Sequence, residues 1–344
     1  MPGARGEASA AVITALLSPS GSGDVGLAAA SVDAALRRCD DLLRDEDLQL
    51  ALLVLYELHY QGLHGVDDRW EWNPGLLGVR AQIEGVFEDT LRRRAHVPGG
   101  VGPNAEEVAN ALFALAAKDT GPGLSTYVAK RATDQQLREL LIHRSVYQLK
   151  EADPHTWAIP RLVGGPKAAL VEIQADEYGG GDPERMHSAL FGRTMRGLGL
   201  DDTYGAYVDL VPALTLASVN MMSMFGLHRR LRGAIAGHLA AFEMTSSIPN
   251  RLYGNGFRRH GYGPDVTWYF DEHVEADAVH EQIAGRDLAG KLAEQQPALH
   301  DDVLFGAAAC LYLDELVGAW IAEHWQRDET SLRTATRPAT RAAL

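Results

Sequence analysis

The stretch QQLRELLIHRSVYQL at residues 135–149 shows the pattern that governs most of this chain. Its apolar residues recur at spacings of three and four, which places them on one face of an α-helix. Residues 31–43 (SVDAALRRCDDLL) and 105–118 (AEEVANALFALAAK) repeat this spacing. Alternation with a period of two, the sign of a half-buried strand, does not exceed chance. The pattern therefore predicts an all-α protein, a helical bundle with an N-terminal helical extension.

Composition divides the chain of 344 residues into four parts. They are a loosely ordered tail rich in Ala, Gly and Ser (1–28), an N-terminal helical region (29–130), the bundle (131–327) and a flexible tail rich in Thr, Arg and Ala (328–344). Within the bundle, the glycines at 179–181 end one helix. Asp182 and Pro183 then predict the start of the next, as an N-cap followed by proline at the first helical position.

The overall composition excludes several classes of protein. The formal net charge is −14, with 32 Lys+Arg against 46 Asp+Glu, which argues against binding to nucleic acids or to anionic membranes. No uninterrupted apolar run reaches the roughly 18 residues that span a bilayer. The N-terminus lacks the features of a signal peptide, and Cys39 and Cys310 are too few for a disulfide framework. We therefore expect a cytoplasmic protein with two packed thiols.

Only two of the 13 histidines have a carboxylate three residues earlier, and both pairs are candidate metal ligands. They are Glu184 with His187 and Asp277 with His280. Residues three apart share a face of a helix, so both side chains of a pair can reach one metal ion. Such a pair also arises by chance on a solvated helix face, so neither pair is sufficient alone. Carboxylate-bridged di-iron proteins combine two such pairs with two glutamates from other helices.

Two glutamates are candidates for the remaining positions. Glu243 follows Ile235 and Leu239 at spacings of four, so its carboxylate lies on the apolar stripe of a helix. Burying an unpaired carboxylate costs free energy, which a metal ion or a partner arginine would offset. Glu151 closes the helix at 135–149 on the face that carries Tyr147.

Two further residues extend the candidate set. His273 lies four residues before Asp277 and seven before His280, so these three share one helical face, and Glu177 ends an earlier helix. The candidate ligands are then Glu151, Glu177, Glu184, Glu243, Asp277, His187, His273 and His280. This set is too large for one ion and suits two. Oxygen and nitrogen donors without thiolate favour iron or manganese over a structural zinc site.

Three stretches of the chain resemble the heme-oxygenase-like di-iron oxidases and oxygenases, also called iron-containing redox enzymes. They are EIQADEYGGGDPERMHSALF (172–191), GLHRRLRGAIAGHLAAFEMTSS (226–247) and YFDEHVEADAVHEQIA (269–284), and the resemblance covers about residues 140–324. It implies a heme-oxygenase-like bundle that binds non-heme iron. The ligands that it implies are Glu151, Glu184, His187, Glu243, His273, Asp277 and His280, of which the run from 273 to 280 is the most specific match. Glu177 looks like the additional carboxylate of members that oxygenate nitrogen.

The function that the resemblance implies is oxidation of a small molecule by O₂ at two iron ions that cycle between Fe(II) and Fe(III). Glu177 favours N-oxygenation of an amine or amino-acid-like compound in natural-product biosynthesis, with Glu177 and Glu184 as catalytic carboxylates. Oxidative C–C cleavage or desaturation on the same cluster is the alternative, and a non-catalytic helical binding module is a second. No flavin or ferredoxin-type motif is present, so we expect an external electron donor. We also expect a homodimer.

Overall fold

The chain folds as helices, as the spacing of its apolar residues predicts. The computed structural model describes residues 1–19, 23–118 and 123–334, without the side chains of residues 275–278, and this part contains no strand. Helices begin at local signals in the sequence. Asn73 caps one helix by accepting hydrogen bonds from the N–H groups of Gly75 and Leu76. Thr133 and Gln136 form a capping box at the start of another. The all-α prediction is confirmed.

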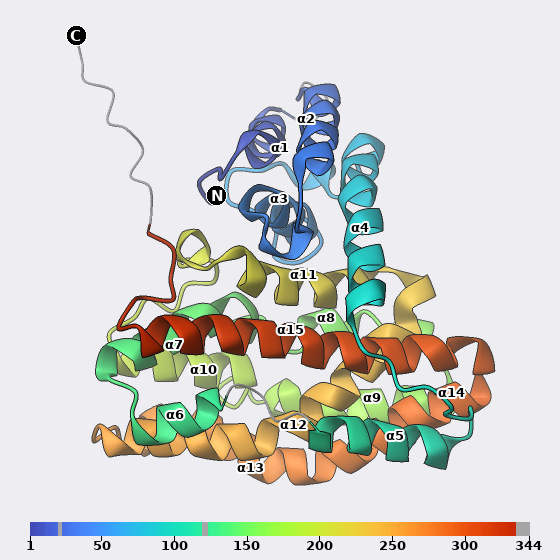
Figure 1. Cartoon of the computed structure of the whole chain (residues 1–344), viewed down its shortest axis with the longest axis vertical. Helices are drawn as coiled ribbons and strands as arrows, with labels where there is room; N and C mark the ends of the chain where they lie inside the picture. Colours follow the sequence, from blue (N-terminus) through green and yellow to red (C-terminus); the bar gives the residue numbers. More distant parts are fainter. Residues whose placement is uncertain (20–22, 119–122, 335–344) are drawn as a thin grey trace.

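Four helices at the N-terminus form a group of their own above the bundle (Figure 1). They are α1 (Glu7–Leu17), α2 (Val25–Arg38), α3 (Glu46–Glu57) and α4 (Pro74–Arg94). The prediction of a loose tail over residues 1–28 is wrong for α1. Its residue Leu16 is fully buried, and the Asp47 carboxylate accepts hydrogen bonds from the N–H groups of Ala8 and Ser9 at 2.8 and 2.7 Å. This carboxylate caps α1 from a neighbouring helix, a contact that sequence spacing does not reveal.

The remaining helices form the bundle in the lower part of Figure 1, with α11 nearest to the N-terminal group. They are α5 (Ala105–Lys118), α6 (Leu124–Lys130), α7 (Asp134–Gln148), α8 (Asp153–Thr156), α9 (Gly164–Glu177), α10 (His187–Gly197), α11 (Ala213–Leu227), α12 (Arg232–Arg259), α13 (Pro264–Gln282), α14 (Lys291–Gln295) and α15 (His300–Gln326), with a π-helix, η7 (Ile283–Gly290), after α13. The long helices α12 and α15 approach backbone to backbone. A Cβ on Gly237 would collide with the Val303 carbonyl, and one on Gly306 with the Ala234 carbonyl.

A buried ion pair joins the N-terminal helices to the bundle. Lys150 Nζ lies 2.5 Å from Glu57 Oε1, at the end of α3, and both side chains are buried. Tyr204 donates a hydrogen bond of 2.8 Å to the same carboxylate oxygen. Because Lys150 directly precedes Glu151, this pair fixes the segment from which a candidate ligand projects.

The helix α15 packs mainly against α12 and α11. Residues 297–326, which include it, are long and apolar enough to cross a membrane by length and composition, but 56% of the most apolar window is buried inside the protein. Asp301, Asp302 and Asp314 interrupt its apolar sequence, so this segment contains no uninterrupted apolar run of membrane-spanning length. Beyond α15 the prediction of a flexible tail is wrong as far as Ser331, which is fully buried and hydrogen-bonded to Glu139. Residues 335–344 of that tail lie outside the described residues.

Candidate metal centre

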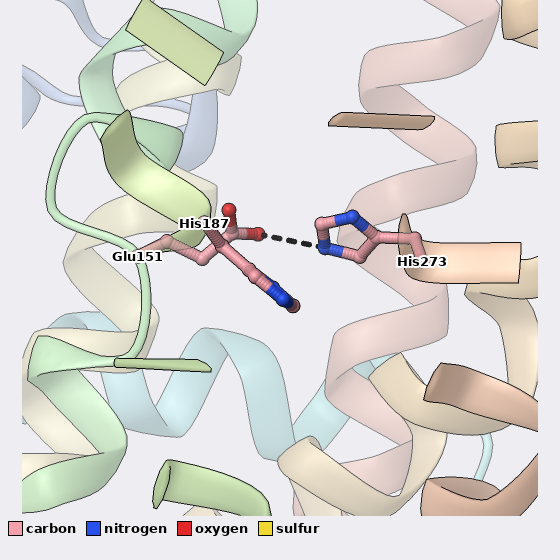
Figure 2. A group of neighbouring side chains, drawn as sticks. All are labelled: Glu151, His187 and His273. Carbon is pink, nitrogen blue, oxygen red and sulfur yellow. Dashed lines mark ion pairs between the residues drawn. The ribbon is translucent and has the colours of Figure 1, made fainter. Parts of the chain in front are cut away.

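Three predicted ligands from separate parts of the bundle meet in a first buried group. Glu151 follows α7, His187 is the first residue of α10, and His273 lies in α13. One donor atom from each lies within 4.8 Å of the other two. Figure 2 shows His273 reaching Glu151 and His187 from the opposite side, and its Nε2 lies 3.6 Å from Glu151 Oε1. This group can therefore bind a cation with one carboxylate and two imidazoles, the donor types that iron accepts.

A second buried group contains Glu177, Glu243 and His280, again with one donor atom of each within 4.8 Å of the others. Glu177 is the last residue of α9, Glu243 lies within α12, and His280 lies near the end of α13. His280 Nδ1 is 3.5 Å from Glu243 Oε2. The apolar stripe that placed Glu243 inside the bundle in the sequence is confirmed by its burial, since the residue is only 4% exposed.

The two groups adjoin each other. His187 Nδ1 of the first group lies 3.0 Å from Glu177 Oε2 of the second. The rings of His187 and His273 lie with their centroids 4.4 Å apart. The described side chains therefore form one continuous cluster of three carboxylates and three imidazoles, held by α9, α10, α12, α13 and the segment after α7.

Two of the imidazoles are oriented by partners outside the cluster. His273 Nδ1 donates to the backbone carbonyl of Tyr269 at 2.7 Å, and His280 Nε2 donates to Asp176 Oδ2 at 3.0 Å. The opposite nitrogen of each ring therefore faces the carboxylates, as in histidines that bind metals in proteins. Tyr269 also donates a hydrogen bond of 3.0 Å to Glu151 Oε1. These contacts fix both rings and one carboxylate in advance of binding.

Unsatisfied nitrogen atoms show that the cluster suits a cation. The Nδ1 atoms of His187 and His280 are buried and have no hydrogen-bond partner, although both face carboxylates. A buried polar atom without a partner is costly, and a coordinated ion would satisfy it. The oxygen and nitrogen donors present fit iron.

The electrostatics of the cluster follow from its mixture of charges. Burial by itself would raise the pKa of Glu177, but His187, His273 and His280 outweigh it and lower the pKa to about 2. Burial would lower the pKa of His280, but Glu243 and Asp176 outweigh it and raise the pKa to about 9. The pKa of Glu243 is raised because burial dominates there. The carboxylates thus favour the protonated, positively charged form of the neighbouring imidazoles when no metal is bound.

Glu184 does not join this cluster, so the predicted pairing of Glu184 with His187 on one helix face is wrong. Its side chain is 80% exposed and its Oε2 lies 3.0 Å from Arg193 Nη2. The next helix begins at His187 and not after Asp182 and Pro183, because the Asp182 carboxylate accepts the Glu184 N–H at 3.0 Å and closes a turn. Spacing by three gives a shared face only within a helix. Glu177 supplies the carboxylate beside His187 instead.

The other half of the predicted motif is only partly described. His273 and His280 do lie on one face of α13 and point into the cluster. The side chain of Asp277 lies outside the described residues, so its role as a ligand stays a prediction.

Sequence reasoning missed the two residues that orient the histidines. Tyr269 precedes His273 by four residues, a spacing that could have indicated their contact. Asp176 directly precedes Glu177, and its side chain is 62% exposed. Asp176 reaches His280 because α9 packs against η7, the π-helix that follows α13, so the sequence holds no signal for this contact.

A cavity of about 740 Å³ opens beside the cluster. Glu151, Glu177, Glu243 and His273 line part of its wall, together with Val219, Met222, Leu239 and Phe242. A space of this size suits a small organic molecule, and its wall combines apolar side chains with a few polar groups. A molecule in the cavity would therefore contact the same carboxylates that face the metal.

Comparison with known proteins assigns the family. Residues 138–315, just over half of the chain, match the iron-containing redox enzymes, and this segment contains both groups of ligands. The chain belongs to the iron-containing redox enzymes. The all-α, heme-oxygenase-like fold that the resemblance implied is thereby confirmed. As an iron-containing redox enzyme, the chain has a cluster whose donors suit the metal of its family.

A relative of stated activity lies at greater distance. This iron-containing redox enzyme is 27% identical over 147 residues to a nitrosourea synthase from Streptomyces achromogenes subsp. streptozoticus. The match spans 42% of the present chain and 31% of the synthase. The chain therefore corresponds to about a third of that protein.

Proposed function

We propose that the chain is a non-heme di-iron oxygenase that uses O₂ to oxidise a small molecule. The observation that carries this proposal is the adjoining pair of buried groups, each with three oxygen or nitrogen donors and joined through His187 and Glu177. A single ion would leave half of these buried donors without a partner. Two ions would use both groups, and Glu177 of the second group lies against His187 of the first.

Each residue of the proposed site has a distinct task. Glu151, His187 and His273 would hold one ion, and Glu177, Glu243 and His280 the other, with Asp277 as a further predicted ligand. When bound, two ferrous ions supply electrons for the reduction of O₂ and an oxidant for the substrate. Tyr269 and Asp176 keep the imidazole rings in place through their hydrogen bonds. The apolar wall of the cavity keeps bulk water from the reacting atoms.

N-oxygenation of an amine or amino-acid-like substrate is the outcome that we propose first. Its support is the similarity to a nitrosourea synthase, together with the inward position of Glu177. Natural-product biosynthesis is the proposed setting. We also propose an external electron donor that restores Fe(II), and a homodimer as the working assembly.

Uptake of O₂ combined with product mass analysis tests this function. Protein loaded anaerobically with Fe(II) is mixed with O₂ and candidate amines, and we expect uptake that depends on the amine and a product that gains oxygen on nitrogen. A product that has lost carbon dioxide or two hydrogens would instead support oxidative cleavage or desaturation on the same cluster. Absence of O₂ uptake by iron-loaded protein with every candidate would contradict an oxygenase.

A further inference from the structure

An arginine lines the cavity without an anion beside it. Arg144 projects from α7 into the cavity, and its guanidinium carbon lies 4.5 Å from the centroid of the Tyr253 ring. Stacking on an aromatic face leaves the edge of the guanidinium, which carries its N–H donors, available to a planar anion. The side chain is therefore held in position while its donors stay free.

Comparison with other enclosed arginines shows how unusual this is. Arg5 lies 2.5 Å from Glu46, and Arg80 lies 3.1 Å from Glu84. Within the described part of the chain, no ion pair or hydrogen bond engages the guanidinium of Arg144, and Glu151 and Asp314 act on it only by longer-range attraction. An enclosed cation without a close counter-ion is unfavourable, and a bound anion would offset that cost.

The position of Arg144 sets the length of a molecule that can reach both it and the metal. Arg144 lies four residues before the end of α7 at Gln148, which is about 6 Å of helical rise, and Glu151 follows in the turn after that end. Both residues line the cavity, at separate positions along the chain. An anion bound by Arg144 would leave the rest of the molecule several bonds in which to reach the cluster.

The wall of the same cavity also contains hydrogen-bond acceptors that receive no donor. The amide oxygens of Gln148, Gln174 and Asn250 are buried without a hydrogen-bond partner, and all three residues line the cavity. The orientation of Gln174 is fixed, because its Nε2 donates to Ala152 O at 2.9 Å and to Thr156 Oγ1 at 2.6 Å. Its Oε1 is therefore an acceptor that awaits an N–H donor.

Gln174 also places this acceptor near the metal. It precedes Glu177 by three residues in α9, so the two side chains share a face of the helix. A substrate N–H that binds Gln174 Oε1 would lie at the end of the cavity where Glu177 faces the cluster. The cavity wall thus offers both a cationic group and an N–H acceptor.

We propose that Arg144 is a specificity-determining residue that binds the carboxylate of the substrate, while Gln174 accepts a hydrogen bond from its amine or guanidine nitrogen. The substrate class is an amino acid or a similar compound that carries a carboxylate several bonds from the nitrogen to be oxidised. This inference rests on the proposed function for its reaction, but the binding site itself depends only on the cavity.

Calorimetric titration with matched probes tests the proposal. The pairs are L-arginine with agmatine and L-lysine with cadaverine, which differ by a carboxylate, and they are titrated anaerobically into Fe(II)-loaded protein. We expect the carboxylate-bearing member to bind about 10- to 100-fold more tightly, the range for a hydrogen-bonded pair of charges. Arg144→Met should abolish this preference, and Arg144→Lys should restore part of it. Arg251→Met, an exposed arginine of α12 outside the cavity, is the matched control and should leave it unchanged.

A second comparison separates this site from direct binding of carboxylates to iron. In a His187→Ala/His280→Ala variant, tighter binding of the carboxylate-bearing probe should survive if Arg144 causes it. It should disappear if iron binds the carboxylate. The heat of binding can be measured without any reaction. The binding proposal can therefore be tested even if the protein is not an oxygenase. Gln174→Leu should weaken the binding of both probes of a pair by the same factor. A preference that survives Arg144→Met, or the absence of saturable binding by both carboxylate-bearing probes, would overturn the proposal.

Discussion

Two sets of histidines in the bundle are equally buried and yet have opposite electrostatic character. The metal-facing histidines are His187, His273 and His280, and the neutral histidines are His143, His155 and His238. Every one of them is at most 5% exposed. The metal-facing set looks onto carboxylates, whereas the neutral set contacts hydroxyl groups or other imidazoles. Burial therefore does not distinguish a ligand from a packed side chain.

The pKa values of His187 and His280 are raised, whereas those of the three neutral histidines are lowered. Burial lowers the pKa of His143 and of His155 to about 4, with little opposition from nearby carboxylates. For His280 the same effect of burial is outweighed by Glu243 and Asp176, and the pKa rises to about 9. The difference shows that carboxylates packed against a buried imidazole create a site for a cation, and that the imidazole alone does not.

Removing imidazoles from each set should give the largest contrast. The variant His187→Ala/His280→Ala removes one nitrogen donor from each group, so we expect it to lose nearly all bound iron. The matched control is His155→Gln/His238→Gln, which replaces two histidines whose ring nitrogens lie 3.1 Å from each other and which belong to neither group of ligands. It should keep its iron. Metal analysis of both proteins, after circular dichroism confirms their folding, decides the matter, and equal iron contents would break the comparison.

Carboxylates on the two sides of the glycine run at 179–181 offer a second contrast. Glu177→Ala should lose about half of the bound iron, because it removes a donor from one of two groups. Glu184→Ala should lose none, because that side chain is exposed and paired with Arg193. Iron retention after dialysis measures both. Greater loss from the Glu184 variant would show that the turn rearranges when metal binds and that this account of the ligands is wrong.

The partner of His280 should have a smaller effect. Asp176→Asn weakens the acceptor that orients the ring, and we expect roughly 10- to 100-fold weaker binding of Fe(II). Glu172→Gln, an exposed carboxylate on the same helix, is the control and should bind iron as the parent does. Competition with a chromophoric chelator gives both affinities. Equal affinities would mean that Asp176 does not hold the ring when metal is bound.

The neutral histidines should reveal themselves in the pH dependence of stability. Because the pKa of His143 falls from 6.5 to about 4 on folding, the unfolded chain takes up a proton first as the pH drops. The contribution of His143 to the free energy of unfolding is therefore fully present above pH 6.5 and is lost as the pH falls towards 4. Between about pH 7 and 5.5 this residue should account for about 1 kcal/mol of lost stability. The free energy of unfolding, measured with urea on metal-free protein, should fall less steeply with pH in His143→Gln than in the parent. An equal dependence on pH in the two proteins would contradict this role of His143.

Sequence alone could identify most of this site, and the exceptions have physical causes. The seven-residue spacing of His273 and His280 is a property of one helix, so it could be predicted without tertiary structure. The burial of Glu243 followed from its apolar neighbours in the same way. Glu184 was misplaced because a turn closed by the Asp182 carboxylate stands where the first turn of the next helix was predicted.

Other residues of the site could not be found from sequence because their roles depend on packing between helices. Asp176 reaches His280 from another helix, and Arg144 is distinguished by its place in the cavity wall beside Tyr253. The fold was easier to predict, because apolar periodicity repeats along the whole bundle. The N-terminal α1 escaped prediction because its cap, Asp47, comes from α3.

Anaerobic titration with Fe(II) followed by rapid mixing with O₂ shows whether the cluster binds two iron ions that react together. Mössbauer spectra of the metal-free protein, titrated with isotopically enriched Fe(II), count the ions that bind and report their oxidation. Two adjoining ligand groups should saturate at two Fe(II) per chain, and both ions should become Fe(III) together on exposure to O₂. Saturation at one iron per chain, or two ions that stay ferrous in O₂, would contradict it.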